Sequence, residues 1–209
     1  MKTIVARLRR MLTARIMLND IRSPASLAAT RRSGKPRDMG APGATPAQLD
    51  RILAAATRVP DHGKLAPWRF VIIPADRREA FATLLERAYR VEHPEPGKVE
   101  LEAVRQFALQ APTMIVALSS PTQQSHIPLW EQQLSAGAAC MSLLWATHAE
   151  GLVAGWLTGW AAYSDMVRDA LGGGTGDRIA GFLFIGTPTR ALEERPRPER
   201  DKVVSVWAG

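Results

Sequence analysis

The chain of 209 residues carries a formal net charge of +7, and 46% of its residues are hydrophobic. This length and composition fit one domain with a sizeable core, and the single Cys140 excludes an intramolecular disulfide and a cysteine-based zinc cluster. Residues 1–22 hold +5 of the charge, which leaves +2 for the rest. Because no motif with interleaved aromatic residues accompanies this charge, it does not indicate nucleic-acid binding.

Residues 1–22 place basic side chains beside apolar residues that recur near helical spacing. Such a helix would suit peripheral contact with anionic lipid. We interpret it instead as a dispensable extension in front of one domain, residues 23–209. No apolar run reaches the roughly 18 residues of a spanning helix, and the start lacks the apolar stretch of a signal peptide. We therefore expect no stable membrane insertion and a cytoplasmic location.

Helices and apolar strands follow one another along the rest of the chain. Thr45-Pro46-Ala47-Gln48 combines a Thr cap, a proline in the first turn and a Gln three residues after the cap, so a helix begins there. The expected helices span 24–30, 46–58, 76–89, 99–110, 130–150 and 164–171. The expected strands span 69–73, 113–119, 151–157 and 179–185. The pattern predicts an α+β fold, a mixed sheet flanked by helices.

Two segments of this pattern hold unusual numbers of small residues. Ser135 to Cys140 contains only small side chains, so we expect that helix to pack on most sides, in a core or at a subunit interface. Gly172 to Gly176 looks like a phosphate loop, but it follows a helix and lacks Gly-Lys-Ser/Thr. We interpret it as a flexible connection. No strand is followed by G-x-G-x-x-G, so there is no dinucleotide fingerprint.

The stretch from Arg58 to Phe70 reads Arg-Val-Pro-Asp-His-Gly-Lys-Leu-Ala-Pro-Trp-Arg-Phe. Pro60 and Pro67 stiffen this connection, which presents His62 and Lys64 as polar groups. By itself it fits an ordinary helix-to-strand loop. Two other stretches favour a functional site over an ordinary loop. They are Arg31-Arg32-Ser33 upstream and, downstream, the run from Glu131 to Ala138 that leads into Gly155-Trp156-Leu157-Thr158-Gly159-Trp160.

Taken in this order, the stretches resemble the nitroreductase family, small homodimeric flavoproteins that carry FMN, and in particular its minimal bacterial branch. The resemblance runs from about Arg31 to the C-terminus, and its most specific part is the Pro-Asp-His-Gly-Lys-Leu-Ala-Pro-Trp-Arg-Phe run. It implies a nitroreductase-like fold and a homodimer with a swapped C-terminal arm. That arm, rich in Pro and Arg after Pro188, needs a surface on which to lie.

The resemblance also implies where FMN is held. Arg31 to Ser33 would clamp the phosphate, because guanidinium groups donate bidentate hydrogen bonds. Arg195 or Arg197 of the arm could add charge there. The remaining cofactor-binding candidates are Arg58, His62 reaching across from the second subunit, Lys64, Leu65, and Gly155, Trp156, Leu157 and Thr158 along the flavin ring.

One residue of this site departs from the family pattern, and one further segment follows it. Some relatives have a basic residue where Leu157 stands, so that position bears on the choice of substrate. The segment 146–151 is associated with the nicotinamide nucleotide in relatives. The sequence shows no spacing typical of a metal site and no catalytic nucleophile or carboxylate pair. By the resemblance, the flavin itself would carry the redox chemistry.

The predicted function is that of an FMN-dependent NAD(P)H oxidoreductase. NADH or NADPH would reduce the flavin, which would then reduce a small acceptor such as a nitroaromatic or a quinone in a ping-pong mechanism. One alternative is a flavin-binding or storage module without turnover. Another is a basic adaptor that associates with membranes through residues 1–22. The sequence distinguishes neither NADH from NADPH nor one acceptor from another.

Overall fold

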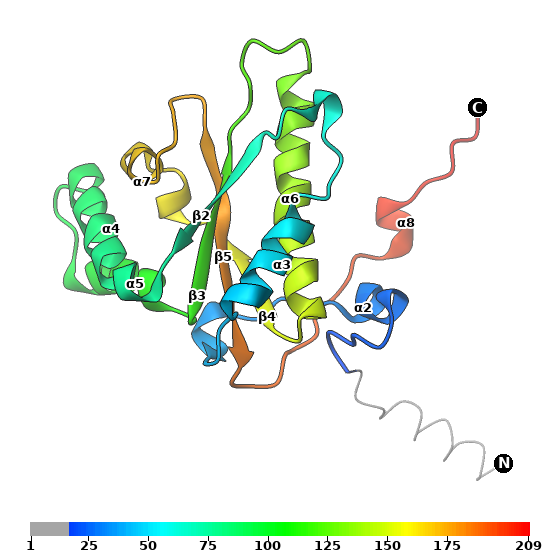
Figure 1. The fold of residues 1–209 in the computed structure, drawn as a ribbon, viewed down its shortest axis with the longest axis horizontal. Coiled ribbons are helices and arrows are strands. Elements are labelled where there is room, and N and C mark those ends of the chain that lie inside the picture. The colour runs from blue at the N-terminus through cyan, green and yellow to red at the C-terminus, as the bar shows by residue number, and fades with distance from the viewer. Residues whose placement is uncertain (1–16) are drawn as a thin grey trace, which may run out of the picture.

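A computed structural model describes residues 17–209 (Figure 1). Most of the basic N-terminal extension, residues 1–16 of 1–22, lies outside the described residues, and so does the amphipathic helix considered for it. The described helices are α2 (Pro24–Thr30), α3 (Pro46–Ala56), α4 (Arg78–Glu92), α5 (Lys98–Leu109), α6 (Leu129–Ala149), α7 (Asp165–Ala170) and α8 (Arg200–Val203). The strands are β1 (Met39–Gly40), β2 (Trp68–Ile73), β3 (Thr113–Ser119), β4 (Val153–Leu157) and β5 (Arg178–Pro188). Short 3₁₀ turns lie at Pro36–Asp38, His62–Lys64, Ala75–Arg77 and Trp160–Ala162.

Strand β5 lies at the centre of the sheet. It pairs with β3, with β4 and, at its last residues, with β1, while β2 pairs with the far side of β3. All four of these pairings are antiparallel, so the α+β class is confirmed but the expected mixed sheet is wrong. An apolar run such as that of β3 indicates a strand buried on both faces, which is common in parallel sheets. Here helices cover both faces of antiparallel strands instead (Figure 1).

Alternate residues of the central strands build two separate cores. Met114, Val116 and Leu118 of β3 pack with Phe182 and Phe184 of β5 in a cluster shared with α4, α5 and α7. Their neighbours along the strands, Ile115 and Ala117 of β3 and Leu183 and Ile185 of β5, face the opposite cluster with α3 and α6. Because successive strand residues point to opposite faces, one continuous apolar run supplies both cores.

The predicted helix starts agree with the structure where a cap defines them. Thr45 and Gln48 form the expected capping box, with the Gln48 amide nitrogen bonded to Thr45 Oγ1 at 3.3 Å and the Thr45 amide bonded to Gln48 Oε1 at 3.0 Å. Ser164 likewise caps α7 through the Val167 amide. The small-residue segment of α6 is packed as expected, with Ser135, Ala136, Ala139 and Cys140 buried, whereas Leu129, Trp130 and Leu134 at the start of the helix are exposed. An apolar helix face left open indicates contact with another surface.

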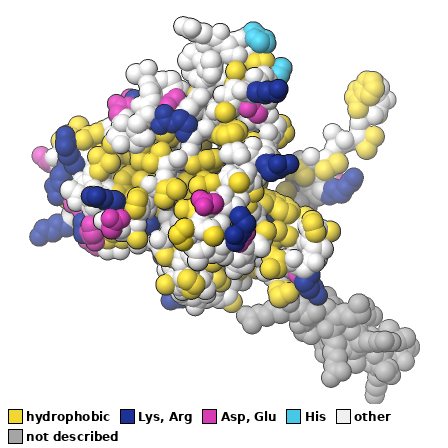
Figure 2. All heavy atoms as spheres, in the orientation of Figure 1, with side chains coloured by type: hydrophobic (Ala, Val, Ile, Leu, Met, Phe, Trp, Pro, Cys, Tyr) yellow, Lys and Arg dark blue, Asp and Glu magenta, His cyan; other side chains and the backbone are white. Residues whose placement is uncertain are grey.

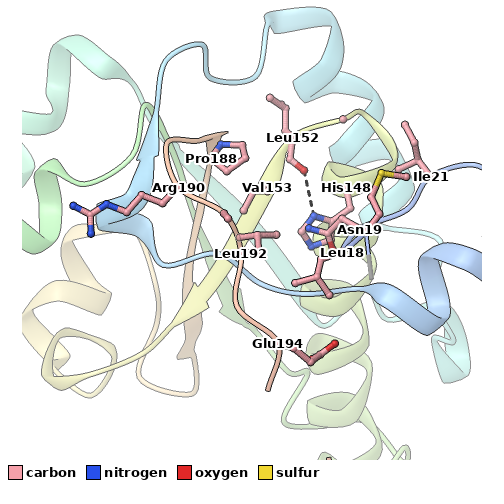
Figure 3. Close-up of a pocket in the computed structure, with 13 residues that line it drawn as sticks. Leu18, Asn19, Ile21, His148, Leu152, Val153, Pro188, Arg190, Leu192 and Glu194 are labelled. Atoms are coloured by element: carbon pink, nitrogen blue, oxygen red, sulfur yellow. Dashed lines mark hydrogen bonds between the residues drawn. The ribbon is translucent and has the colours of Figure 1, made fainter. Parts of the chain in front are cut away.

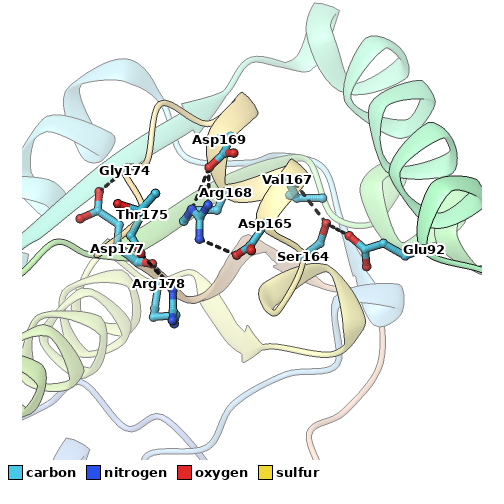
Figure 4. A network of polar contacts seen from close by, with 10 residues as sticks. All are labelled: Glu92, Ser164, Asp165, Val167, Arg168, Asp169, Gly174, Thr175, Asp177 and Arg178. Carbon is cyan, nitrogen blue, oxygen red and sulfur yellow. Dashed lines mark hydrogen bonds and ion pairs between the residues drawn. The ribbon is translucent and has the colours of Figure 1, made fainter.

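The glycine segment after α7 is a closed turn rather than a flexible connection (Figure 4). The amides of Gly172 and Gly173 donate to the Asp169 and Arg168 carbonyls, and the amide of Gly174 donates to the Asp177 carboxylate at 3.0 Å. Nearby, the buried Arg168 side chain is paired with Asp165 and Asp169. With these donors already bonded, the segment does not offer them to a phosphate, so it is a connection as interpreted, but a hydrogen-bonded one.

The chain after Pro188 leaves the sheet and first packs against the body, with Leu192 on the core and Glu193 bonded to Arg32. From α8 onward it projects away from the body (Figure 1). Val203, Val204, Val206 and Trp207 of this C-terminal arm are exposed, and the hydrophobic spheres along it stand out in Figure 2. None of the helices within residues 17–209 combines the length and apolar character that crossing a bilayer requires.

Candidate functional site

The Arg31–Ser33 segment directly follows α2 and lies against the C-terminal arm. Arg31 caps α2 through its amide, which donates to the Leu27 carbonyl, and its Nη1 donates to Ser33 Oγ at 3.1 Å. Arg32 Nε donates to the Glu193 carbonyl at 2.7 Å, and Lys35 Nζ pairs with the Glu193 carboxylate at 3.3 Å. The structure therefore joins the predicted phosphate clamp to the arm.

Three guanidinium groups gather around one carboxylate at this junction. Arg197 Nη2 donates to Glu194 Oε1 at 3.0 Å. Burial lowers the pKa of Arg31 from its ordinary value, and the positive charges of Arg197 and Arg32 lower it further, whereas Glu194 opposes them. The pKa of Glu194 is lowered by a hydrogen bond from the Arg195 amide and by the charges of Arg197 and Arg32. The site is thus an electropositive cluster in which Glu194 supplies one negative charge.

The clamp also contacts β4, the strand expected to line the flavin ring. The Gly34 amide donates to the Ala154 carbonyl at 3.1 Å. At Gly155 a Cβ atom would stand 2.7 Å from the Gly34 carbonyl oxygen, so only glycine allows this approach. The structure places Arg31–Ser33, Arg197 and the start of β4 beside one another.

The outer edge of β4 presents backbone groups beyond this contact. The Ala154 carbonyl points away from β5, since it bonds to Gly34. The direction alternates along a strand, so the amide and carbonyl of Trp156 also face outward. The Trp156 side chain is held on the sheet, with Nε1 donating to the Ala180 carbonyl at 2.9 Å. Leu157 and Thr158 are exposed where the strand ends.

The other predicted residues lie elsewhere. His62, Lys64 and Leu65 belong to a loop beside the first turns of α6, where His62 Nδ1 lies 2.7 Å from Glu131 Oε2. Arg58 is exposed just after α3. The clamp lies at the opposite end of α6, as Figure 1 shows from the positions of α2 and the His62 loop.

The length of α6 sets the separation between these two groups. Glu131 is near its start and His148 near its end, and 17 residues at a rise of 1.5 Å place them roughly 25 Å apart. A single described chain therefore does not bring Arg31 and His62 into one site. Both groups can meet only if a second chain supplies one of them.

A cavity of about 760 Å³ adjoins the clamp at the end of α6 (Figure 3). Its walls come from the N-terminal segment, the start of β4 and the arm, and they include Leu18, Asn19, His148, Leu152 and Leu192. His148 is buried, with Nδ1 3.2 Å from the Leu152 carbonyl, so Nδ1 carries the proton. Nε2 has no hydrogen-bond partner in the described part of the chain. Burial, with a smaller effect of Arg31, lowers the His148 pKa to about 4, so the ring is neutral at pH 7.

Sequence reasoning gave no role to several residues that organise this region. His148, Asn19 and Glu194 surround or contact the clamp, and Asp61 holds the His62 loop. The sequence around these residues gives little indication of their roles, because each acts through a partner far along the chain or through backbone geometry. The turn that the Asp61 side chain closes through the Leu65 and Ala66 amides is the one case that a local pattern could have indicated.

Other chemistry finds no support in the described residues. Cys140 is buried in α6, and burial raises the pKa of its thiol to about 12, so it is not a nucleophile. Within residues 17–209, no three side chains of His, Cys, Asp or Glu gather as a metal site.

Comparisons with a family profile and with curated proteins both match this chain to nitroreductases. The profile of the family described as "Nitroreductase family" matches residues 28–187. A protein of Escherichia coli (strain K12) named "Putative NAD(P)H nitroreductase YdjA" is 35% identical over 147 residues, which cover 70% of this chain and 79% of that protein.

Solved structures share the fold. A nitroreductase-like family protein from Bacillus cereus has a TM-score of 0.75 at 21% identity, covering 90% of this chain and 97% of that one. The FMN and NADPH-dependent nitroreductase NfnB from Sphigopyxis sp. strain HMH has a TM-score of 0.69 at 22% identity, covering 90% and 99%. At these identities the two structures show likeness of fold.

Proposed function

The chain belongs to the nitroreductase family, and from this membership we propose that it is an FMN-dependent NAD(P)H oxidoreductase. Its acceptor would be a small molecule such as a nitroaromatic or a quinone. The observation that carries this proposal is the cluster of Arg31, Arg32 and Arg197 around Glu194, next to the open edge of β4. Related proteins are named as NAD(P)H nitroreductases, and one solved structure with the same fold is described as FMN and NADPH-dependent.

The chemistry of the available donors fits a flavin mononucleotide. A phosphate monoester needs several cationic donors, and Arg31, Arg32 and Arg197 provide them together with the Ser33 hydroxyl. Burial lowers the pKa of Arg31, and the neighbouring positive charges of Arg197 and Arg32 lower it further, so a phosphate would relieve that repulsion. The outward amide of Trp156 is a donor for the polar edge of a ring. No dinucleotide fingerprint accompanies these groups, which suits a mononucleotide.

Bound FMN would supply hydride uptake from NADH or NADPH and electron delivery to the acceptor. The chain itself would bind and orient. Arg31, Arg32 and Arg197 would fix the phosphate, and the edge of β4 would hold the ring through backbone groups. Leu157, exposed at the end of β4, would offer the acceptor an apolar contact in place of a basic side chain.

A complete site would need two chains. The His62 loop and the Arg31 clamp lie at opposite ends of α6. A two-fold axis that packs two α6 helices antiparallel would set the start of one beside the end of the other. The exposed Trp130 and Leu134 on α6, and Val206 and Trp207 on the arm, are apolar surfaces that such a homodimer would cover.

Anaerobic titration of the reconstituted protein tests this proposal. The protein is incubated with FMN and passed through gel filtration, and about one FMN should remain per subunit, since a two-fold dimer has two equivalent sites. Addition of NADH or NADPH should then bleach the flavin absorbance, and a quinone or nitroaromatic should restore it. Arg31→Glu should lose the flavin.

Each failure has its own meaning. Retained flavin that neither nucleotide bleaches would favour the flavin-binding or storage module. A folded, colourless protein that ignores FMN would contradict the proposed function and favour the basic adaptor.

A further inference from the structure

The loop that carries His62 has an unusual backbone. Gly63, Lys64 and Ala66 all have positive φ angles, of 75°, 56° and 46°. Glycine adopts this region freely, whereas a residue with a Cβ atom does so at an energetic cost. Two such residues, Lys64 and Ala66, within three positions require contacts that hold the loop in place.

One carboxylate makes those contacts. Asp61 Oδ1 accepts a hydrogen bond from the Leu65 amide at 3.1 Å, and Oδ2 accepts one from the Ala66 amide at 2.8 Å. The Asp61 carbonyl also accepts from the Lys64 amide at 3.2 Å. Asp61 therefore binds three successive amides and closes the turn around both strained residues.

The two ends of the loop are anchored on α6 by a single hydroxyl. Ser135 Oγ donates to the Pro60 carbonyl at 2.7 Å and accepts from Trp68 Nε1 at 3.2 Å. Ser135 thus fixes where the loop starts and ends, whereas Asp61 fixes its shape. The side chains of His62 and Lys64 remain exposed at its tip.

We infer that Asp61 is the positioning residue of this half of the cofactor site. Its carboxylate holds Lys64 and Ala66 in the left-handed conformation, and this presents His62 and Lys64 to a flavin bound at the clamp of the partner subunit. The inference rests on the proposed function and adds to it the group that organises the loop before any cofactor arrives. Asp61 itself touches neither cofactor nor substrate.

The experiment compares Asp61→Ala with Asp50→Ala. Asp50 is an exposed carboxylate on α3 that has no hydrogen bond or ion pair in the described structure, so the control removes the same charge. Two quantities are measured on proteins with matched melting temperatures. They are amide hydrogen exchange in the cofactor-free protein and the dissociation constant for FMN from flavin fluorescence.

Asp61→Ala should speed exchange at the Leu65 and Ala66 amides and weaken FMN binding at least tenfold, and Asp50→Ala should change neither. Ala66→Gly, introduced into Asp61→Ala, should recover much of the affinity, because glycine reaches the required φ without help. Should Asp61→Ala fail to fold, Asp61→Asn replaces it; it retains one acceptor and should show an intermediate loss.

The outcomes separate the inference from the proposed function. A wild-type protein that does not bind FMN overturns the proposed function. Wild-type protein that binds FMN while the Asp61 variant binds it as tightly as the Asp50 variant overturns only the inference. Weakened binding without recovery by Ala66→Gly also overturns it, because Asp61 would then act otherwise than through the backbone.

Discussion

Asn19 and Arg32 exchange two hydrogen bonds. Asn19 Oδ1 accepts from the Arg32 amide at 2.6 Å, and Asn19 Nδ2 donates to the Arg32 carbonyl at 3.0 Å. Asn19 has a φ of 55°, a conformation that Asn tolerates better than most residues. The neighbouring Asp20 is buried and bonds through its amide to Thr30. The end of the segment that we expected to be dispensable, residues 1–22, therefore holds the clamp in place.

This pairing changes the expected result of truncation. Removal of residues 1–16 should leave FMN affinity nearly unchanged, because the family match begins after them. Removal of residues 1–22 should weaken it, since the backbone of Arg32 loses both partners. Asn19→Gly in the full chain keeps the φ angle and removes the two bonds, so at about 1 kcal/mol per bond it should weaken FMN binding roughly tenfold or more. Flavin fluorescence titration measures all three, and equal affinities throughout would separate Asn19 from the site.

The clamp should distinguish FMN from riboflavin by its charges. Arg31→Gln removes a partly buried cation and should weaken FMN binding by about ten- to a hundredfold, at about 1.5–3 kcal/mol for a charged hydrogen bond. Glu194→Gln removes the competing negative charge and should strengthen FMN binding. Neither change should alter the affinity for riboflavin, which has no phosphate. The comparison fails if both ligands respond equally, because the variants would then act on the fold rather than on phosphate recognition.

His148 should make stability depend on pH. Its pKa is lowered from 6.5 to about 4 in the folded protein, so the unfolded chain binds the proton first as the pH falls. The contribution of neutral His148 to the free energy of unfolding is complete above about pH 6.5. It is lost progressively as the pH falls towards 4, by up to about 3 kcal/mol. Denaturant unfolding across this range should show the free energy of unfolding of the wild type falling, relative to that of His148→Phe, as the pH falls. His126 is exposed, so His126→Ala should keep the wild-type dependence of unfolding free energy on pH. Loss of that dependence in His126→Ala as well would mean that His148 is not its source.

Local signals in the sequence were sufficient for the main helices and strands, although not for the two-residue strand β1 or the short helix α8. The Thr45–Gln48 capping box formed both of its bonds, and strand 113–119 was placed residue for residue. Such features depend on neighbours in the chain, whose chemistry is written in the sequence itself. The direction of the strands was not written there, because β5 pairs with segments as distant in the chain as β1 and β3, and apolar runs look alike in parallel and antiparallel sheets.

The same limit explains what was found of the site. The family resemblance indicated Arg31, Arg197 and the β4 segment, and the structure places them together. It could not indicate Glu194 or Asn19, whose contacts with the clamp arise from tertiary packing across long stretches of chain. Nor could it reveal that the Arg31 and His62 groups lie at opposite ends of one helix, since that follows from how α3 and α6 pack.

The last prediction is that the site is shared between two chains, and a mixed dimer tests it. Arg31→Glu should repel the cofactor phosphate, and His62→Ala should remove the contact from the other end of α6. Where each single variant is inactive as a homodimer, both of its sites are defective. In the heterodimer one site receives both lesions and the other receives neither, so activity should recover to about half of the wild-type value per dimer.

Co-expression with two different tags yields this heterodimer, and activity is measured after two successive affinity steps. A matched control pairs Arg31→Glu with Arg197→Glu. Arg197 lies beside Arg31 in the described structure, through the Glu194 carboxylate that both approach. Because those two residues belong to one chain's clamp, their heterodimer should have one lesion in each site and recover nothing. Recovery in the control together with none in the Arg31–His62 pair would mean that the arm's Arg197, rather than His62, crosses between subunits.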